Sequence, residues 1–195
     1  GFPHFSMSYE EKLLEFSSFQ RLNRDSLFDG ETIKQAQHGL GLTWSYFPHH
    51  WNVKCNRNLA VMEAWSNEAK RKQAVEKSLK LGRYEILDGK PFLGDAKMRA
   101  AIAYVSGVQR VSNFRPSAAA LIYDKFSRGA VWDMSSGYGG RLLGAIASPN
   151  VGSYVGTDPD FETFIGLQRL KDDFAHITRT EVTLVNKGSE DYAPE

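Results

Sequence analysis

The sequence predicts an α/β protein in which a mainly helical N-terminal region, residues 1–110, precedes three parallel strands with helices in residues 111–195. Two observations lead to this class. Before residue 110 apolar residues recur mostly at helical spacing, whereas after residue 129 short apolar segments alternate with helical patterns. The 195-residue chain is also 42 % hydrophobic and 24 % charged, which is enough apolar material for a core.

The N-terminal helices are predicted from capping residues and from the spacing of apolar side chains. Ser8 is a suitable N-cap and is followed three residues later by Glu11, as in a capping box. Gly82 ends a long helical pattern, and Pro116 suits a first helical turn. The predicted helices cover residues 8–22, 58–81, 94–105 and 118–126, and the pattern is irregular over residues 29–58.

The second half of the chain contains three predicted strands separated by two predicted helices. The strands cover residues 130–134, 153–157 and 181–185, and the helices cover residues 141–148 and 161–175. An order of strand, helix, strand, helix and strand is typical of a parallel sheet in a doubly wound fold.

Composition excludes several classes of protein. No apolar run is long enough to cross a membrane, and the N-terminus lacks the pattern of a signal peptide, so we expect a cytoplasmic protein without membrane contact. The single cysteine, Cys55, excludes an internal disulfide and a multi-cysteine metal site, and we expect a small buried or half-buried thiol there rather than a catalytic nucleophile. His49 and His50 lack spaced partners, so we expect aromatic packing rather than a metal.

Charge is distributed unevenly along the chain. Residues 1–128 contain 19 basic and 13 acidic side chains, whereas residues 129–195 contain 5 and 10. The basic part favours a polyanionic partner, and solvated helix faces are the alternative explanation. The candidate contacts with a nucleic-acid backbone are the basic residues of one predicted helix: Lys70, Arg71, Lys72, Lys77 and Lys80.

The most informative pattern is a strand, a glycine-rich turn, a helix and a second strand that ends in an acidic residue. Glycines at 137, 139 and 140 allow positive φ and close approach of a ligand to the backbone. Asp158, at the end of the second strand, can accept hydrogen bonds from the two ribose hydroxyls of an adenosine. Asp133, at the end of the first strand, can accept a hydrogen bond from an amino group or orient the loop.

The same pattern favours S-adenosylmethionine over other nucleoside cofactors. The dinucleotide fingerprint is incomplete because Leu142 stands where its third glycine would be, and no P-loop motif is present. Asp133 and Asp158 together would repel a pyrophosphate and tolerate the positive sulfonium of the methyl donor.

Four segments resemble the motifs of Rossmann-like S-adenosylmethionine-dependent methyltransferases. The likeness is greatest to the bacterial and phage DNA amino-methyltransferases that modify N6 of adenine or N4 of cytosine. Asp133–Ala145 resembles motif I, Tyr154–Pro159 motif II, Gly188–Asp191 motif III and Val111–Pro116 motif X. The resemblance implies that the strands form the first half of a Rossmann-like methyltransferase sheet.

The resemblance also implies a role for each matching residue. Asp158 would bind the ribose, and Asp191, with Glu190 beside it, would bind the adenine. The remaining cofactor-binding residues would be those of the methionine loop and of the pocket wall: Asn113, Phe114, Pro116, Asp133, Ser135, Gly137, Gly139 and Gly140.

One motif of this family is absent from the sequence. Amino-methyltransferases carry [DNS]-P-P-[YFW], which holds the target amine and stacks on a flipped base, and the chain contains no Pro-Pro pair. A sheet of three strands would also leave residues 130–134 at an edge. We therefore expect the cofactor-binding part of a truncated or split methyltransferase that acts on DNA, completed by a C-terminal segment or a second polypeptide. A non-catalytic nucleoside-binding or partner-regulating module and a small-molecule methyltransferase are the alternatives.

Overall fold

The computed structural model describes residues 1–174 and 176–194, and the chain forms two compact units. The helical unit consists of Gly1–Phe5 and Pro48–Ser112, and the sheet unit consists of Ser6–Phe47 and Asn113–Glu195. The sequence analysis placed residues 6–47 in the N-terminal region. They belong with the sheet unit because Phe16 and Phe19 enter its hydrophobic core.

The helical unit contains four short helices and a hairpin. Its elements are the 3₁₀ helix η2 (Pro48–Asn52), α3 (Val61–Ser66), α4 (Glu68–Lys80), β1 (Glu85–Leu87), β2 (Lys90–Phe92) and α5 (Asp95–Ala103). They surround a core that consists of Phe2, Trp51, Val61, Ala64, Ala74, Ile102, Ala103 and Val105.

The prediction of a single helix over residues 58–81 is wrong, because the helix is interrupted at Asn67. The backbone of Asn67 is extended, with φ −94° and ψ 115°, and its side chain accepts a hydrogen bond from the Lys70 N–H at 3.1 Å. A short polar side chain that caps the following turn competes with a continuous helix. Gly82 ends α4 in the left-handed region, with φ 65°, as predicted.

The hairpin of the helical unit was not predicted. Asp88 and Gly89 have φ of 50° and 73° and form a two-residue turn that pairs Leu87 with Lys90. An Asp-Gly pair is a strong signal for such a turn. Each flanking strand has only three residues, all exposed, so the usual alternation of buried and exposed side chains is missing.

The sheet unit contains three strands and most of the longer helices. Its elements are α1 (Tyr9–Gln20), η1 (Arg24–Leu27), α2 (Leu40–Trp44), α6 (Pro116–Phe126), β3 (Gly129–Asp133), α7 (Gly140–Ala147), β4 (Val151–Thr157), α8 (Phe161–Phe174), β5 (Glu181–Val185) and η3 (Ser189–Asp191). Ser8 and Glu11 form the predicted capping box. Ala175, the last residue of the predicted helix 161–175, lies outside the described residues.

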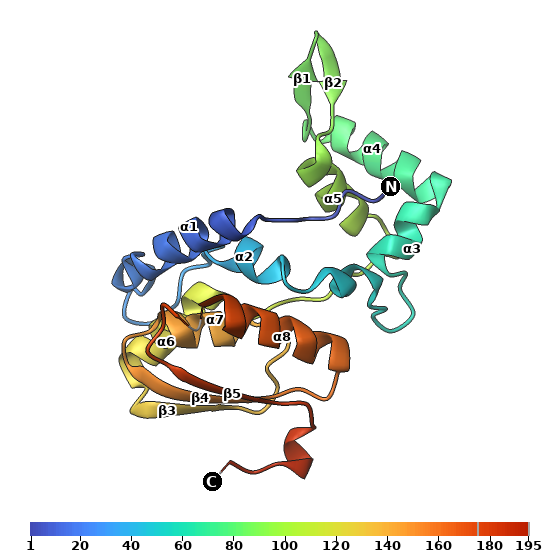
Figure 1. The fold of residues 1–195 in the computed structure, drawn as a ribbon. Helices are drawn as coiled ribbons and strands as arrows, with labels where there is room; N and C mark the ends of the chain where they lie inside the picture. Colours follow the sequence, from blue (N-terminus) through green and yellow to red (C-terminus); the bar gives the residue numbers. More distant parts are fainter. Residues whose placement is uncertain (175, 195) are drawn as a thin grey trace. The chain divides into compact units, whose positions relative to one another are not determined.

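The three strands form the predicted parallel sheet, in the order β3-β4-β5. Figure 1 shows that the α-helices of the sheet unit lie on one face of this sheet. Tyr154, at the centre of β4, is fully buried on that face and belongs to the hydrophobic core that also contains apolar side chains of α1, α7 and α8. An α/β class is therefore confirmed, with one helical layer on the sheet.

No α-helix of the described sheet unit lies on the opposite face of the sheet, and the short 3₁₀ helix η3 follows the carboxyl end of β5. Trp132 is paired in register with Val155, which is paired with Thr183, so these three side chains form a row across this face. Trp132 is 44 % exposed. β3 pairs only with β4 within the described residues, so it is an edge strand, as expected.

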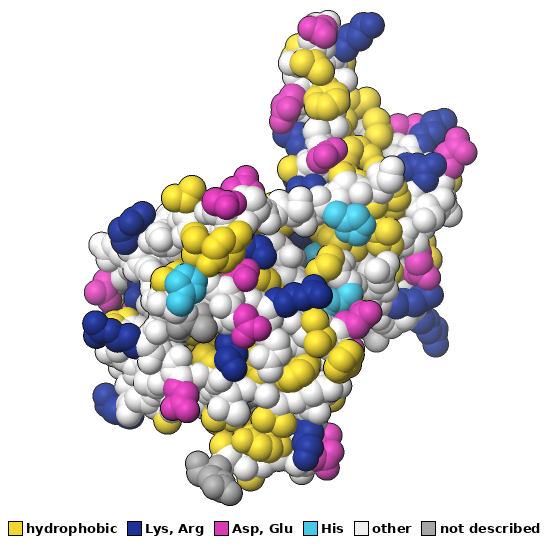
Figure 2. Space-filling model, in the orientation of Figure 1, with side chains coloured by type: hydrophobic (Ala, Val, Ile, Leu, Met, Phe, Trp, Pro, Cys, Tyr) yellow, Lys and Arg dark blue, Asp and Glu magenta, His cyan; other side chains and the backbone are white. Residues whose placement is uncertain are grey.

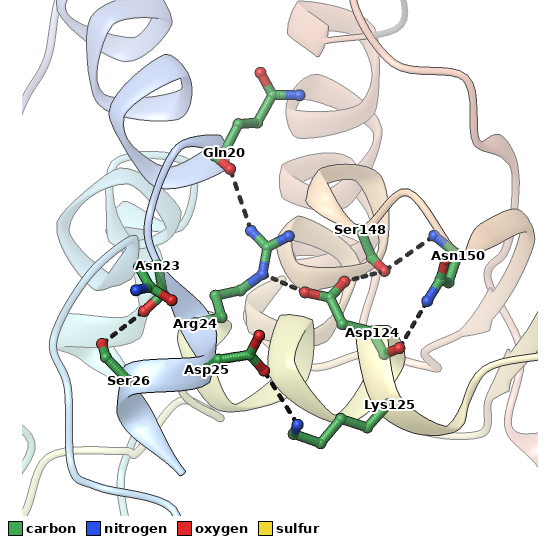
Figure 3. Close-up of polar contacts among 9 residues, drawn as sticks. All are labelled: Gln20, Asn23, Arg24, Asp25, Ser26, Asp124, Lys125, Ser148 and Asn150. Carbon is green, nitrogen blue, oxygen red and sulfur yellow. Dashed lines mark hydrogen bonds and ion pairs between the residues drawn. The ribbon is translucent and has the colours of Figure 1, made fainter.

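A polar network attaches η1 to the rest of the sheet unit (Figure 3). The Asp124 carboxylate of α6 accepts hydrogen bonds from Arg24 Nε at 2.5 Å and from Ser148 Oγ at 2.6 Å. Asn150 donates to the Asp124 carbonyl at 2.6 Å, and Lys125 pairs with Asp25 at 3.1 Å. These bonds are a second reason why residues 6–47 belong to the sheet unit.

None of the described helices is both long and apolar enough to span a bilayer.

Candidate functional site

The candidate site lies where β3, β4 and β5 end, around the turn between β3 and α7. Because the strands are parallel, their carboxyl ends meet at one edge of the sheet. Gly137 and Gly139 have φ of 53° and 72°, a conformation that disfavours a side chain. Ser136 N–H donates to the Thr157 carbonyl at 2.9 Å, which fixes this turn to the end of β4.

Asp158 contacts the glycine-rich turn directly. It is buried, and its Oδ2 accepts a hydrogen bond from the Gly137 N–H at 2.8 Å, while Oδ1 accepts one from the Asp160 N–H at 3.1 Å. A carboxylate has about four acceptor positions, so two remain for ligand hydroxyls. Burial raises the pKa of Asp158, and the two backbone N–H groups oppose that shift.

Asp133 has a different environment from Asp158. Its carboxylate accepts hydrogen bonds from the Ser135 N–H at 3.2 Å, from Tyr154 Oη at 2.6 Å and from Arg141 Nε at 2.8 Å. Arg141 therefore balances its charge, and Asp133 orients the turn. Of the acidic pair expected from the sequence, only the Asp158 carboxylate has no basic partner among the described residues. Burial, together with Asp133, raises the pKa of Tyr154.

Close packing explains the other glycines of the turn. A Cβ at Gly140 would overlap with the carbonyl oxygen of Phe114. A Cβ at Gly139 would lie 3.0 Å from Leu170 and 3.1 Å from Phe47. These two positions therefore bring the start of α7 against the segment before α6 and against the core, independently of any ligand.

The three residues before and within the start of α6 have different roles in the structure. Asn113 Nδ2 donates to Thr43 Oγ1 at 3.0 Å and to the Tyr138 carbonyl at 2.8 Å, so it supports the turn. Phe114 is 42 % exposed, with the Arg141 guanidinium 5.4 Å from its ring centre. Pro116 is buried at the first position of α6 and belongs to the packing of the unit.

Glu190 and Asp191 lie in η3, beyond the carboxyl end of β5 and so at the same edge of the sheet. Both side chains are exposed, and the Asp191 N–H donates to the Gly188 carbonyl at 3.1 Å. Thr157, adjacent to Asp158, has a buried Oγ1 for which no hydrogen-bond partner is present among the described residues. A buried hydroxyl without a partner is uncommon.

Three residues that the sequence analysis did not select also shape the site. Arg141 pairs with Asp133, Tyr154 donates to Asp133, and Asn186 Nδ2 donates to the Asp158 carbonyl at 2.9 Å. Asn186 follows the third strand directly, which is a position typical of ligand-binding side chains in parallel sheets. Tyr154 lies on the buried face of β4, a position that strand alternation indicates.

The basic residues selected as nucleic-acid contacts are only partly free. Lys70 Nζ donates to the Ser106 carbonyl at 2.7 Å, Lys77 Nζ donates to the Tyr104 carbonyl at 2.8 Å, and Arg71 donates to the Trp65 carbonyl. Lys72 and Lys80 are exposed.

The remaining candidates for chemistry lie in the helical unit. His50 is buried, with its ring 4.0 Å from that of Trp51, and Cys55 is half-buried. Within the described residues, no group of three or more His, Cys, Asp or Glu side chains is placed to hold a metal ion.

Comparison with known proteins finds no family model, no curated protein and no solved structure that matches the chain. The functional argument therefore depends on the site itself.

Proposed function

We propose that the sheet unit binds S-adenosylmethionine and that the chain is the cofactor-binding part of a Rossmann-like methyltransferase acting on an exocyclic amino group of a DNA base. One observation carries the proposal. The Asp158 carboxylate lies at the end of β4, 2.8 Å from the Gly137 N–H of the turn that follows β3, and keeps two acceptor positions. Two adjacent hydroxyls of a ribose match those positions.

The charge at this edge favours a methyl donor over a dinucleotide. A pyrophosphate is bound by free N–H groups of the glycine-rich turn and of the helix that follows it, and Asp158 already occupies the Gly137 N–H of that turn. The negative carboxylate also repels phosphate and attracts a sulfonium. Because Arg141 balances Asp133, this discrimination depends on Asp158 rather than on an acidic pair.

The bound group would supply an electrophilic methyl on its sulfonium. In this chain Asp158 would orient the nucleoside, and the glycine-rich turn would accept the methionine part close to the backbone. Glu190 and Asp191 would lie toward the adenine. These residues contribute by positioning, which suits direct attack by an amino nitrogen and needs no covalent intermediate with the protein. Groups that hold the target amine would come from a further segment or a second polypeptide.

Calorimetric titration of the purified chain tests the proposal. S-adenosylmethionine and its demethylated product are expected to bind, and NAD is expected not to. Asp158→Ala should abolish binding, whereas Asp172→Asn, which removes an exposed carboxylate of α8 in the same unit, should leave it unchanged. Binding of NAD alone, or equal affinities for the two variants, would contradict the proposal. Binding of adenosine as tight as that of the methyl donor would instead support a nucleoside-binding module.

A further inference from the structure

The helical unit contains a cavity that has no part in the cofactor proposal. Its volume is about 300 Å³, and its walls come from α4, from the segment after α4, and from α5 with the residue that follows it. The lining residues are Ala74, Lys77, Ser78, Leu81, Arg83, Lys97, Ala100, Ala101 and Tyr104.

The cavity combines apolar walls with basic side chains. Three of the lining residues are cations, and none is acidic. Lys77 is fixed by its bond to the Tyr104 carbonyl, and Lys97 is paired with Glu85 at 3.0 Å. All residues of this unit are described, and the structure shows no hydrogen bond or ion pair for the Arg83 side chain. Arg83 is therefore the cation most available to an anionic ligand.

Tyr104 provides an aromatic surface at the same place. Its side chain is 52 % exposed, and the Arg110 guanidinium lies 5.0 Å from its ring centre and donates to its hydroxyl at 2.8 Å. A flat ring beside basic groups is the combination that binds single-stranded nucleic acid, in which bases stack on aromatic rings and phosphates contact cations.

The size of the cavity and the adjoining hairpin indicate the form of the ligand. A volume of about 300 Å³ is at the lower end for ligand pockets, so it suits one nucleotide rather than a duplex. Ile86, Leu87 and Phe92 of the hairpin are each at least 45 % exposed. Figure 2 shows hydrophobic side chains over this hairpin and over the helices beside it. Neighbouring unpaired bases can pack on such a surface.

We propose that this cavity binds one unpaired nucleotide of a single-stranded nucleic acid. The base lies against Tyr104 and the alanines of α4 and α5, and its phosphates contact Arg83 and Lys97. The site is in the helical unit, so it does not depend on cofactor binding by the sheet unit.

Fluorescence anisotropy of a labelled single-stranded oligothymidylate with the full chain tests this site. Arg83→Glu and Tyr104→Ala are each expected to weaken binding by about tenfold. Ala100→Trp, which fills the cavity without a change of charge, is expected to do the same. Arg57→Glu is the matched control, because it makes the same substitution as Arg83→Glu at an exposed residue of the helical unit outside the cavity. It should alter affinity by less than about twofold.

Equal losses for Arg83→Glu and Arg57→Glu, with Tyr104→Ala unchanged, would overturn the proposal, because binding would then reflect net charge alone. Tighter binding of a duplex, or binding of a fatty-acid anion with none of the oligonucleotide, would overturn it as well. Circular dichroism shows whether each variant is folded. If one variant is not folded, the other cavity variants, Ala100→Trp and Tyr104→Ala among them, still test binding at this site. Arg83→Glu should bind S-adenosylmethionine as tightly as the wild type does, because Arg83 lies in the helical unit. A titration of this variant therefore tests the two proposals separately.

Discussion

Two buried aspartates at the ends of neighbouring strands show how environment decides the role of a residue. The Asp133 carboxylate accepts hydrogen bonds from three protein donors, including Arg141, so it is engaged within the protein. Asp158 has two backbone donors, and its pKa is raised by burial. The sequence analysis predicted that both lie at this edge. It could not predict that Arg141 turns back toward Asp133, because that depends on how the first turn of α7 is oriented.

The raised pKa of Asp158 predicts a specific dependence of stability on pH. A folded-state pKa above the ordinary value of 3.8 means that the folded state holds this proton more tightly than the unfolded state does. The resulting stability is present at low pH and is lost as pH rises through the folded-state pKa. Asp158→Asn has no titrating carboxyl at this position and so lacks this pH-dependent contribution to stability. The free energy of unfolding of the wild type minus that of Asp158→Asn should therefore be larger near pH 4 than near pH 7, as measured by urea unfolding without ligand. A difference that is constant or smaller near pH 4 would contradict the assignment.

At the scale of elements, prediction succeeded where a pattern was local and complete. The third strand was predicted at residues 181–185 and is observed as β5 at Glu181–Val185, and Ser8 begins α1 with its capping box. The helix over residues 58–81 was predicted without its break, because the apolar spacing continues from Trp65 to Ala69 across Asn67. The three-residue strands of the hairpin are too short for alternation to be visible.

Asn67 is expected to stabilise α4 as its N-cap. Replacing it with alanine removes the side-chain acceptor for the Lys70 N–H and should lower the free energy of unfolding by about 1 kcal/mol. Asn67→Asp keeps an acceptor and should change the stability much less. Chemical denaturation followed by circular dichroism gives both values. If the two substitutions were equally destabilising, the cap would not be the reason for the break in the helix.

At the scale of the whole molecule, each unit buries a core of its own, and the sheet unit does so on one side of its sheet only. The residues that form the candidate cofactor site all lie in the sheet unit, so the fold explains their proximity without reference to the helical unit. Within the described residues of that unit, no α-helix covers the sheet face that carries Trp132, and β3 pairs only with β4. An open edge beside an exposed tryptophan is a surface that favours self-association.

Trp132 is therefore expected to promote association of the isolated chain. Trp132→Lys places a charge on the open face next to the β3 edge, and a lysine at such a position discourages pairing between edges. Sedimentation velocity over a range of concentrations should show association of the wild type and less association of Trp132→Lys. Ile86→Lys, on the exposed hairpin of the helical unit, is a matched control, because it replaces another exposed apolar strand residue with the same charge. If Ile86→Lys suppressed association as strongly as Trp132→Lys, the effect would come from net charge, and the open face of the sheet would not be the surface responsible.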